Sequence, residues 1–154
     1  MYNLINHHRF MRMAIALARK GDWPYGALLV KDNVILAEAY NTTDSENDTT
    51  AHAEVNVIRK ALKANNGQTL NGSTIYTTGE PCPMCTGAII WAGISQIVYS
   101  ASIPLLIKIG QPQINTRSSD IIRTAPDAIE IVGGILESET VEIIKNHQVP
   151  SLRN

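Results

Sequence analysis

The chain has 154 residues, of which 44% are hydrophobic and 18% charged, a balance that excludes an intrinsically disordered protein and predicts one globular domain over residues 1–154. Its 13 basic and 14 acidic residues are scattered, whereas nucleic-acid-binding proteins usually carry a basic stripe or tail, so a large RNA or DNA partner is disfavoured. The N-terminus lacks the apolar core of a signal peptide. The most apolar later stretch, residues 103–109, is far shorter than the roughly 20 residues that cross a bilayer. We therefore expect a cytoplasmic protein without membrane contact.

Helical and strand patterns alternate along the sequence. The apolar positions of the first segment recur at helical spacing and stop before Gly21. Two later apolar runs flank the polar residues Lys31, Asp32 and Asn33, a pattern typical of a β-hairpin. The predicted elements are a helix around 10–18, strands at 27–30 and 34–40, a helix at 51–64, a strand at 74–78, a helix at 83–91, strands at 96–100 and 130–132, and a helix at 137–146.

This alternation of strands and helices predicts an α/β fold, with a layered sheet that carries helices on both faces. The polar segment 41–50 is expected to be an exposed loop. Residues 103–128 show no clear periodicity, and no element is predicted there.

Two short segments combine residue types that can hold a metal ion, and each lies where a helix is predicted to begin. The first contains His52 and Glu54, with Thr50 as the expected helix cap. The second contains Cys82 and Cys85. Pro83, between the cysteines, suits the first turn of a helix, where its missing N–H has no partner. Residues two apart on a helix do not share a face, so His52 and Glu54 can converge only on a point beyond the helix end.

The histidine and the two cysteines together favour zinc. Two helix N-termini aimed at one point supply positive dipole ends, which favour thiolates. An imidazole and two thiolates suit the tetrahedral nitrogen and sulfur preference of Zn²⁺. The chain has no third cysteine, so we expect one zinc per chain with water or hydroxide as fourth ligand. Glu54 is then placed to act as a general acid and base, a role worth about 10²–10⁴-fold in rate.

An H-x-E motif followed by P-C-x-x-C is typical of zinc-dependent nucleobase deaminases. Here the motifs are His52-Ala53-Glu54 and Pro81-Cys82-Pro83-Met84-Cys85, and the similarity extends over residues 24–100. The sequence thus resembles the cytidine deaminase-like superfamily, in particular its guanine and cytosine deaminase branch. The resemblance implies a three-layer α/β/α sandwich with a mixed five-stranded sheet, and a homodimer.

The resemblance also implies roles for individual residues. By it His52, Cys82 and Cys85 bind zinc, and Glu54 is the catalytic proton shuttle. Substrate binding would involve Asn41, which is similar to an asparagine that hydrogen-bonds the base, together with Tyr25 and Trp91 as pocket walls and Ala53. The implied reaction is the hydrolytic deamination of a nucleobase or nucleoside with release of ammonia.

Other interpretations of the same residues remain open. The cysteine pair could be a dithiol redox centre, although that leaves His52 and Glu54 unexplained. A structural zinc site would need a fourth protein ligand. His7, His8 and His147 could supply one, but they lie outside any motif and are expected at the surface.

The sequence narrows the range of possible substrates but does not identify a single one. The motifs favour guanine or a related aminopurine or nucleoside, with cytosine and tRNA adenosine as alternatives. The near-neutral charge argues against tRNA, which is a polyanion. Guanine deaminases are expected to carry acidic residues after the position of Ser100, where they bind the N–H edge of guanine. In this chain residues 103–117 contain no Asp or Glu, and the first acidic residue after Ser100 is Asp120.

Overall fold

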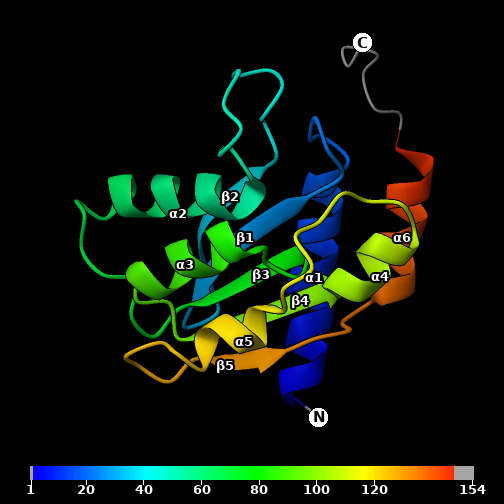
Figure 1. The fold of residues 1–154 in the computed structure, drawn as a ribbon. Coiled ribbons are helices and arrows are strands. Elements are labelled where there is room, and N and C mark those ends of the chain that lie inside the picture. The colour runs from blue at the N-terminus through cyan, green and yellow to red at the C-terminus, as the bar shows by residue number, and fades with distance from the viewer. Residues whose placement is uncertain (1, 148–154) are drawn as a thin grey trace.

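The computed structural model describes residues 2–147, which form a five-stranded sheet flanked by helices (Figure 1). Strand β1 pairs antiparallel with β2 and β3, whereas β3 pairs parallel with β4, and β4 with β5. The predicted mixed sheet is therefore confirmed. The strands are β1 (Gly26–Lys31), β2 (Val34–Tyr40), β3 (Thr74–Gly79), β4 (Gln96–Ala101) and β5 (Glu130–Val132), in the spatial order β2-β1-β3-β4-β5.

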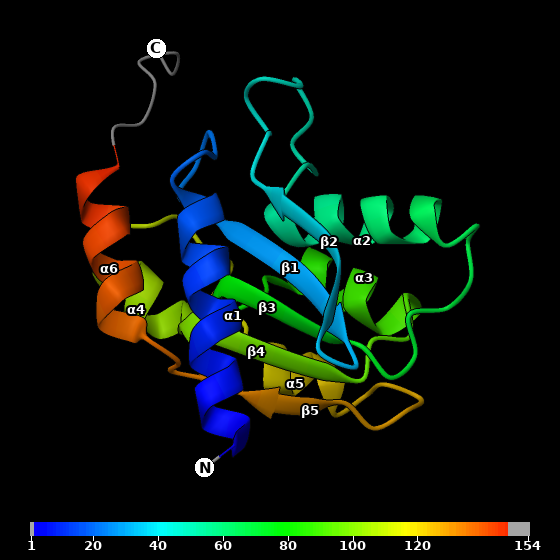
Figure 2. The same ribbon diagram turned by 180° about the vertical axis from the view of Figure 1, so that it is seen from behind.

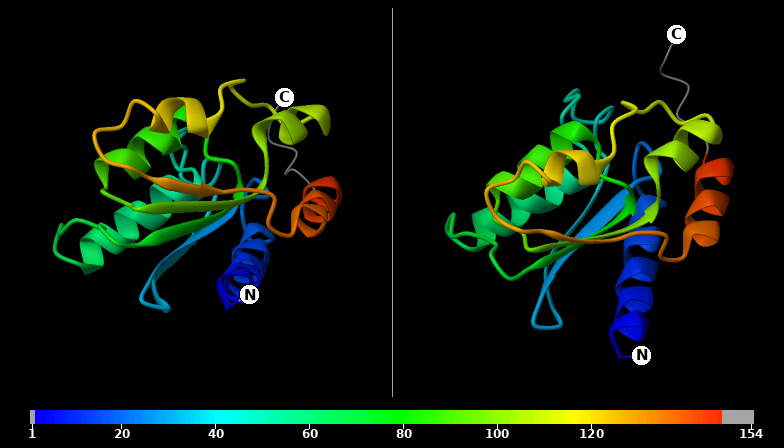
Figure 3. Two further views of the ribbon diagram at one scale, coloured as in Figure 1. Left: turned by 90° about the horizontal axis from the view of Figure 1, so that it is seen from below. Right: turned by 60° about the horizontal axis from the view of Figure 1, so that its bottom comes forward.

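Helices cover both faces of this sheet, as the α/β/α prediction requires. Helices α1 (Tyr2–Ala18) and α6 (Glu137–Asn146) lie on one face, in front of the sheet in Figure 2. Helices α2 (Ala53–Ala64), α3 (Pro83–Trp91) and α5 (Ser118–Ile122) lie on the other, and the layers separate clearly in Figure 3. Helix α4 (Ile103–Lys108) follows β4. Within the described part of the chain, no helix is both long and apolar enough to cross a membrane.

The central strands are buried on both faces because each helical layer packs against them. Leu28 of β1 contributes to the core under α1, whereas its neighbour Leu29 contributes to the core under α2 and α3. Tyr76 and Ile75 of β3 divide in the same way. This alternation follows from the two-residue period of a strand, and it explains why β1 is a nearly continuous apolar run.

Most predicted elements are present, with a few differences. The hairpin turn is tighter than expected, since Asp32 and Asn33 alone connect the strands with positive φ angles of 51° and 62°. Helices α4 and α5 escaped prediction because six and five residues are too few to show helical periodicity. The expectation that His7 lies at the surface is wrong: it is 7% exposed, and its ring is hydrogen-bonded to the Tyr76 hydroxyl at 2.9 Å.

Candidate active site

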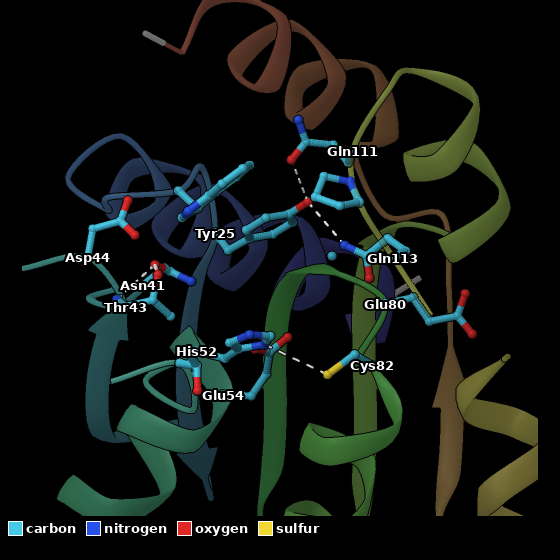
Figure 4. Close-up of a pocket in the computed structure, with 14 residues that line it drawn as sticks. Tyr25, Asn41, Thr43, Asp44, His52, Glu54, Glu80, Cys82, Gln111 and Gln113 are labelled. Carbon is cyan, nitrogen blue, oxygen red and sulfur yellow. Dashed lines mark hydrogen bonds between the residues drawn. The ribbon is translucent and has the colours of Figure 1, made fainter. Parts of the chain in front are cut away.

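The two motif segments begin neighbouring helices on the same face of the sheet. His52 is the N-cap of α2 and Cys82 is the N-cap of α3, both with extended backbone. Pro83 occupies the first turn of α3, as predicted. Thr50 does not cap α2 as expected, because its hydroxyl donates to a carboxylate oxygen of Asp48 at 2.6 Å. With His52 itself at the cap, its side chain projects off the helix end toward Cys82 (Figure 4).

Three potential metal ligands meet in front of these helix ends. Nδ1 of His52 lies 3.7 Å from Sγ of Cys82 and 3.6 Å from Sγ of Cys85. Zinc bonds of about 2.0 Å to nitrogen and 2.3 Å to sulfur in a tetrahedral arrangement require a nitrogen–sulfur separation of about 3.5 Å. The ligand atoms all lie within 4.8 Å of one another, and no other such group occurs in residues 2–147. The three side chains therefore fit a single zinc ion.

The electrostatics of the cluster favour a cation. A hydrogen bond from the Cys85 side chain, together with bonds from His52 and the Cys85 backbone N–H, lowers the pKa of Cys82 to about 4. A thiolate at this position is the form that coordinates metal. The hydrogen bond to Cys82 and full burial raise the pKa of Cys85, so this thiol becomes a second thiolate only where a metal ion compensates its charge. An imidazole with two sulfurs is the donor set that zinc prefers.

Glu54 lies immediately beside the cluster. Its side chain is 5% exposed, and burial raises the pKa of its carboxyl group. One oxygen, Oε1, accepts a 2.8 Å hydrogen bond from the Thr77 hydroxyl of β3. The other, Oε2, lies 3.5 Å from Sγ of Cys85. A buried carboxyl group next to a metal site can hold and transfer a proton.

A pocket of about 260 Å³ opens above these groups, with His52, Glu54 and Cys82 on its floor. The predicted residues Tyr25 and Asn41 both line it (Figure 4). The remaining lining residues are Trp23, Thr43, Asp44, Thr49, Gly79, Glu80, Gln111, Pro112 and Gln113.

Asn41 has a fixed orientation in this pocket. Its Oδ1 accepts hydrogen bonds from the Thr43 backbone N–H at 3.1 Å and from the Thr43 hydroxyl at 2.9 Å. A backbone N–H can only donate, so the amide oxygen must face Thr43. The Nδ2 group of Asn41 is left to point into the pocket as a donor.

The other two substrate-binding predictions are not met within one chain. Trp91 lies at the C-terminal end of α3, is 88% exposed and does not line the pocket. The helix rises about 1.5 Å per residue, so a residue nine positions after Cys82 lies far from the floor. Within one chain, Trp91 therefore does not form a wall of this pocket. The side chain of Ala53 is also outside the pocket, in the core under α2.

Several lining residues were missed by sequence reasoning. Thr43, Asp44 and Thr49 belong to the segment that was expected to be only an exposed loop. Gln111 and Gln113 belong to the segment for which nothing was predicted. These residues belong to no sequence motif, because only the tertiary fold brings them to the pocket.

Comparison with known proteins agrees with this geometry. The family described as "Cytidine and deoxycytidylate deaminase zinc-binding region" matches residues 4–101. A guanine deaminase of Bacillus subtilis is 45% identical over 102 residues, which are 63% of this chain and 65% of that relative. A tRNA-specific adenosine deaminase of Agrobacterium fabrum is 39% identical over 142 residues, which are 88% of this chain and 90% of that relative.

A solved structure gives the same result. It comes from work on A-to-I editing by tRNA:A34 deaminases, has a TM-score of 0.76 and 36% identity, and covers 88% of this chain and 98% of its own. The match over residues 4–101 includes both motif segments and therefore the whole ligand cluster. The chain belongs to the cytidine and deoxycytidylate deaminase zinc-binding family and is a zinc-dependent deaminase.

Proposed function

We propose that the chain, as one deaminase domain, hydrolytically deaminates a free nucleobase or nucleoside, with guanine or a related aminopurine favoured. The observation that carries this proposal is a buried carboxyl group beside a three-ligand cluster on the floor of a small pocket. At about 260 Å³, the pocket falls just below the roughly 300–1,000 Å³ of pockets for drug-sized ligands. That size suits a single base.

The residues of the floor divide the work of the reaction. His52, Cys82 and Cys85 would hold Zn²⁺, which when bound lowers the pKa of water toward about 7 and so supplies a nucleophile near neutral pH. Oε2 of Glu54 accepts a proton from the attacking water as the new C–O bond forms at the amino-bearing carbon. Glu54 passes that proton to a ring nitrogen of the base. It then carries the second water proton to the amino group, the C–N bond breaks, and ammonia and an oxo base remain.

The charge of the pocket supports a small substrate rather than a polymer. The lining residues include Asp44, Glu54 and Glu80 but neither lysine nor arginine. Binding to a nucleic acid depends on neutralising phosphates with basic side chains. A pocket lined by carboxylates and amides favours a free base or nucleoside.

Deamination of a tRNA adenosine is the second candidate. It is favoured by one observation, namely that the similarity to the Agrobacterium fabrum tRNA-specific enzyme covers most of both chains, whereas that to the guanine deaminase covers under two thirds of each. Both candidate functions would use the same zinc ligands and Glu54. They differ only in how the rest of the pocket and the surface around it bind the substrate.

We also propose that the protein is a homodimer that buries one side of α3. Met84 and Trp91 lie seven residues apart, hence on the same side of the helix, and are 37% and 88% exposed. A large exposed aromatic side chain of this kind is typical of an interface. Trp91→Ser should lower the dimer fraction in sedimentation velocity, whereas Ile114→Ser on the segment after α4 should not. An unchanged dimer fraction in Trp91→Ser would contradict the proposal.

The substrate proposal is tested by an ammonia-release screen of the purified zinc protein. The panel contains guanine, guanosine, cytosine, cytidine, adenine, adenosine and a tRNA anticodon stem-loop with adenosine at its wobble position. We expect release from guanine or another aminopurine and none from the stem-loop. Activity confined to the stem-loop would replace the first candidate with the second.

A further inference from the structure

Residues 111–113 form a wall of the pocket, and the segment 103–118 that carries them is held at both ends by one buried carboxylate. Glu80 is 3% exposed and lies two residues before Cys82. Its oxygens accept hydrogen bonds from the Ile103 N–H at 2.8 Å, the Ser118 N–H at 2.9 Å and the Arg117 guanidinium at 3.0 Å. Because both ends meet at this one carboxylate, the middle of the segment is fixed over the pocket.

Tyr25 then fixes the side chains of that middle part. Its hydroxyl donates to Oε1 of Gln111 at 2.8 Å and accepts from Nε2 of Gln113 at 3.3 Å. A phenol has one hydrogen, so when it donates to Gln111 the other glutamine must approach with its nitrogen. The ring is also held in place from the side of Gly79, because it packs so closely there that a Cβ at this glycine would lie only 3.0 Å from it. Gln113 is therefore oriented with its oxygen away from Tyr25.

The free ends of the two glutamines point in different directions. In Figure 4 Oε1 of Gln113 is turned toward the floor, where Glu54 and Cys82 lie, whereas the amide nitrogen of Gln111 points away from it. Oε1 of Gln113 accepts no hydrogen bond from residues 2–147. Across the pocket, the Nδ2 group of Asn41 is a donor. The pocket thus presents a donor on one wall and a neutral acceptor on the other.

We propose that Gln113 is a specificity-determining residue whose side-chain oxygen accepts a hydrogen bond from a ring N–H of the base. This inference rests on the proposed function and narrows its substrate class. The matching substrate carries an acceptor toward Asn41 and an N–H toward Gln113, as an oxo-aminopurine with a lactam N–H does.

A hydrogen bond between neutral groups contributes a modest and measurable preference. Its loss corresponds to a change of about five- to tenfold. Since the contact recognises the substrate without taking part in bond breaking, it should be expressed mainly in KM and in substrate affinity rather than in kcat. Substrates without the N–H should be almost unaffected.

The test compares Gln113→Met with Gln111→Met in the zinc-loaded enzyme. Each variant removes one amide that contacts Tyr25, but only Gln113 directs its free end to the floor. For guanine, Gln113→Met should raise KM about five- to tenfold with little change in kcat, and Gln111→Met should raise it less. For 2-aminopurine, which lacks the lactam N–H, neither substitution should change KM. Gln113→Glu keeps an acceptor oxygen but cannot donate to Tyr25, so it should retain part of the preference for guanine.

Two outcomes would overturn the role of Gln113. One is an unchanged KM for guanine in Gln113→Met, and the other is an equal loss for guanine and 2-aminopurine, which would indicate packing alone. Failure of the proposed function is seen separately, because wild-type enzyme would then deaminate neither purine. Calorimetric binding of guanine to Glu54→Gln, with and without Gln113→Met, gives a second readout that needs no turnover. A Kd that Gln113→Met leaves unchanged there would also reject the proposal.

Discussion

The hydroxyl of Thr77 donates a 2.8 Å hydrogen bond to Oε1 of Glu54 and thereby turns the other carboxylate oxygen toward the cysteines. Thr77 lies on β3 and is fully buried beneath α2. Oε2 is left facing the cysteine side of the site, 3.5 Å from Sγ of Cys85. A strand of the core thus orients the group proposed to move protons.

Replacing the carboxyl group itself should abolish turnover without loss of metal. Glu54→Gln keeps the size of the side chain and can still accept from Thr77, but it cannot take up a proton. We expect kcat to fall by about 10²–10⁴-fold, with zinc remaining near one per chain. Steady-state ammonia release and mass-spectrometric metal analysis check both parts. Ammonia release at the wild-type rate would reject the proton-shuttle role.

Removing only the Thr77 hydrogen bond should have a smaller effect. Thr77→Val is nearly the same shape but lacks the hydroxyl, so Glu54 loses its orienting donor. We expect kcat to fall roughly five- to tenfold, in line with the loss of one hydrogen bond worth about 1 kcal/mol. Thr77→Ser, which keeps the donor, serves as the control. Equal losses in the two variants would show that packing, and not the hydrogen bond, is responsible.

The metal ligands should behave as a set. We expect His52→Ala and Cys85→Ala each to lose stoichiometric zinc, because removing one of three protein ligands leaves too few to hold the ion. His147→Ala is a matched control, since this imidazole bonds instead to the Asp22 carbonyl at 3.1 Å. Zinc per chain is measured after dialysis. Full zinc retention by both ligand variants would contradict the ligand assignment.

The site could be predicted from the sequence only where residues close in the chain are also close in space. His52 with Glu54, and Cys82 with Cys85, are local patterns at helix starts, and the structure brings them together. Gln113 reaches the pocket through long-range contacts, including one to Tyr25, 88 residues earlier in the chain. No local pattern encodes such a contact.

Loss of the Glu80 carboxylate should loosen the pocket wall. Glu80→Gln cannot form the charged bonds to Arg117 and the Ser118 N–H, so residues 103–118 should exchange their amide hydrogens faster. The free energy of unfolding should fall by about 1.5–3 kcal/mol, the size of hydrogen bonds to a charged group. Glu139→Gln is the control, because its ion pair with Arg12 is exposed and should matter by less than about 1 kcal/mol. Unchanged exchange in residues 103–118 would contradict the role of Glu80.

His7 should make the free energy of unfolding depend on pH. Burial lowers the pKa of His7 below its usual 6.5, which outweighs the raising effect of Glu130, while His8 lowers it further. The folded state therefore favours the neutral ring. Its contribution is fully present above the unfolded pKa near 6.5 and is lost as the pH falls below that value. Urea unfolding at about pH 7.5 and about pH 5.5, on either side of that pKa, should show a smaller pH dependence in His7→Gln than in the wild type; an equal dependence would contradict this.

The fold was predictable to the extent that its elements are long and periodic. Strands β1 to β4 and the helices α2, α3 and α6 are long enough to be recognised, whereas β5 has only three residues. Helix α1 begins at Tyr2, before its apolar pattern becomes regular. The short α4 is preceded by its N-cap Ser102, whose hydroxyl accepts a hydrogen bond from the Leu105 N–H. Such short helices are stabilised by caps and neighbours rather than by an amphipathic repeat.

The central claim is that His52, Cys82 and Cys85 hold one zinc ion that keeps a coordination position open to the pocket. Anomalous X-ray scattering at the zinc absorption edge tests this claim most directly. For crystals of the zinc-loaded protein, we predict a single peak within about 2.0–2.3 Å of Nδ1 of His52 and of the sulfur atoms of Cys82 and Cys85, with its remaining side open to the pocket. Absence of a peak there, or a fourth protein ligand that closes the ion off from the pocket, would contradict it.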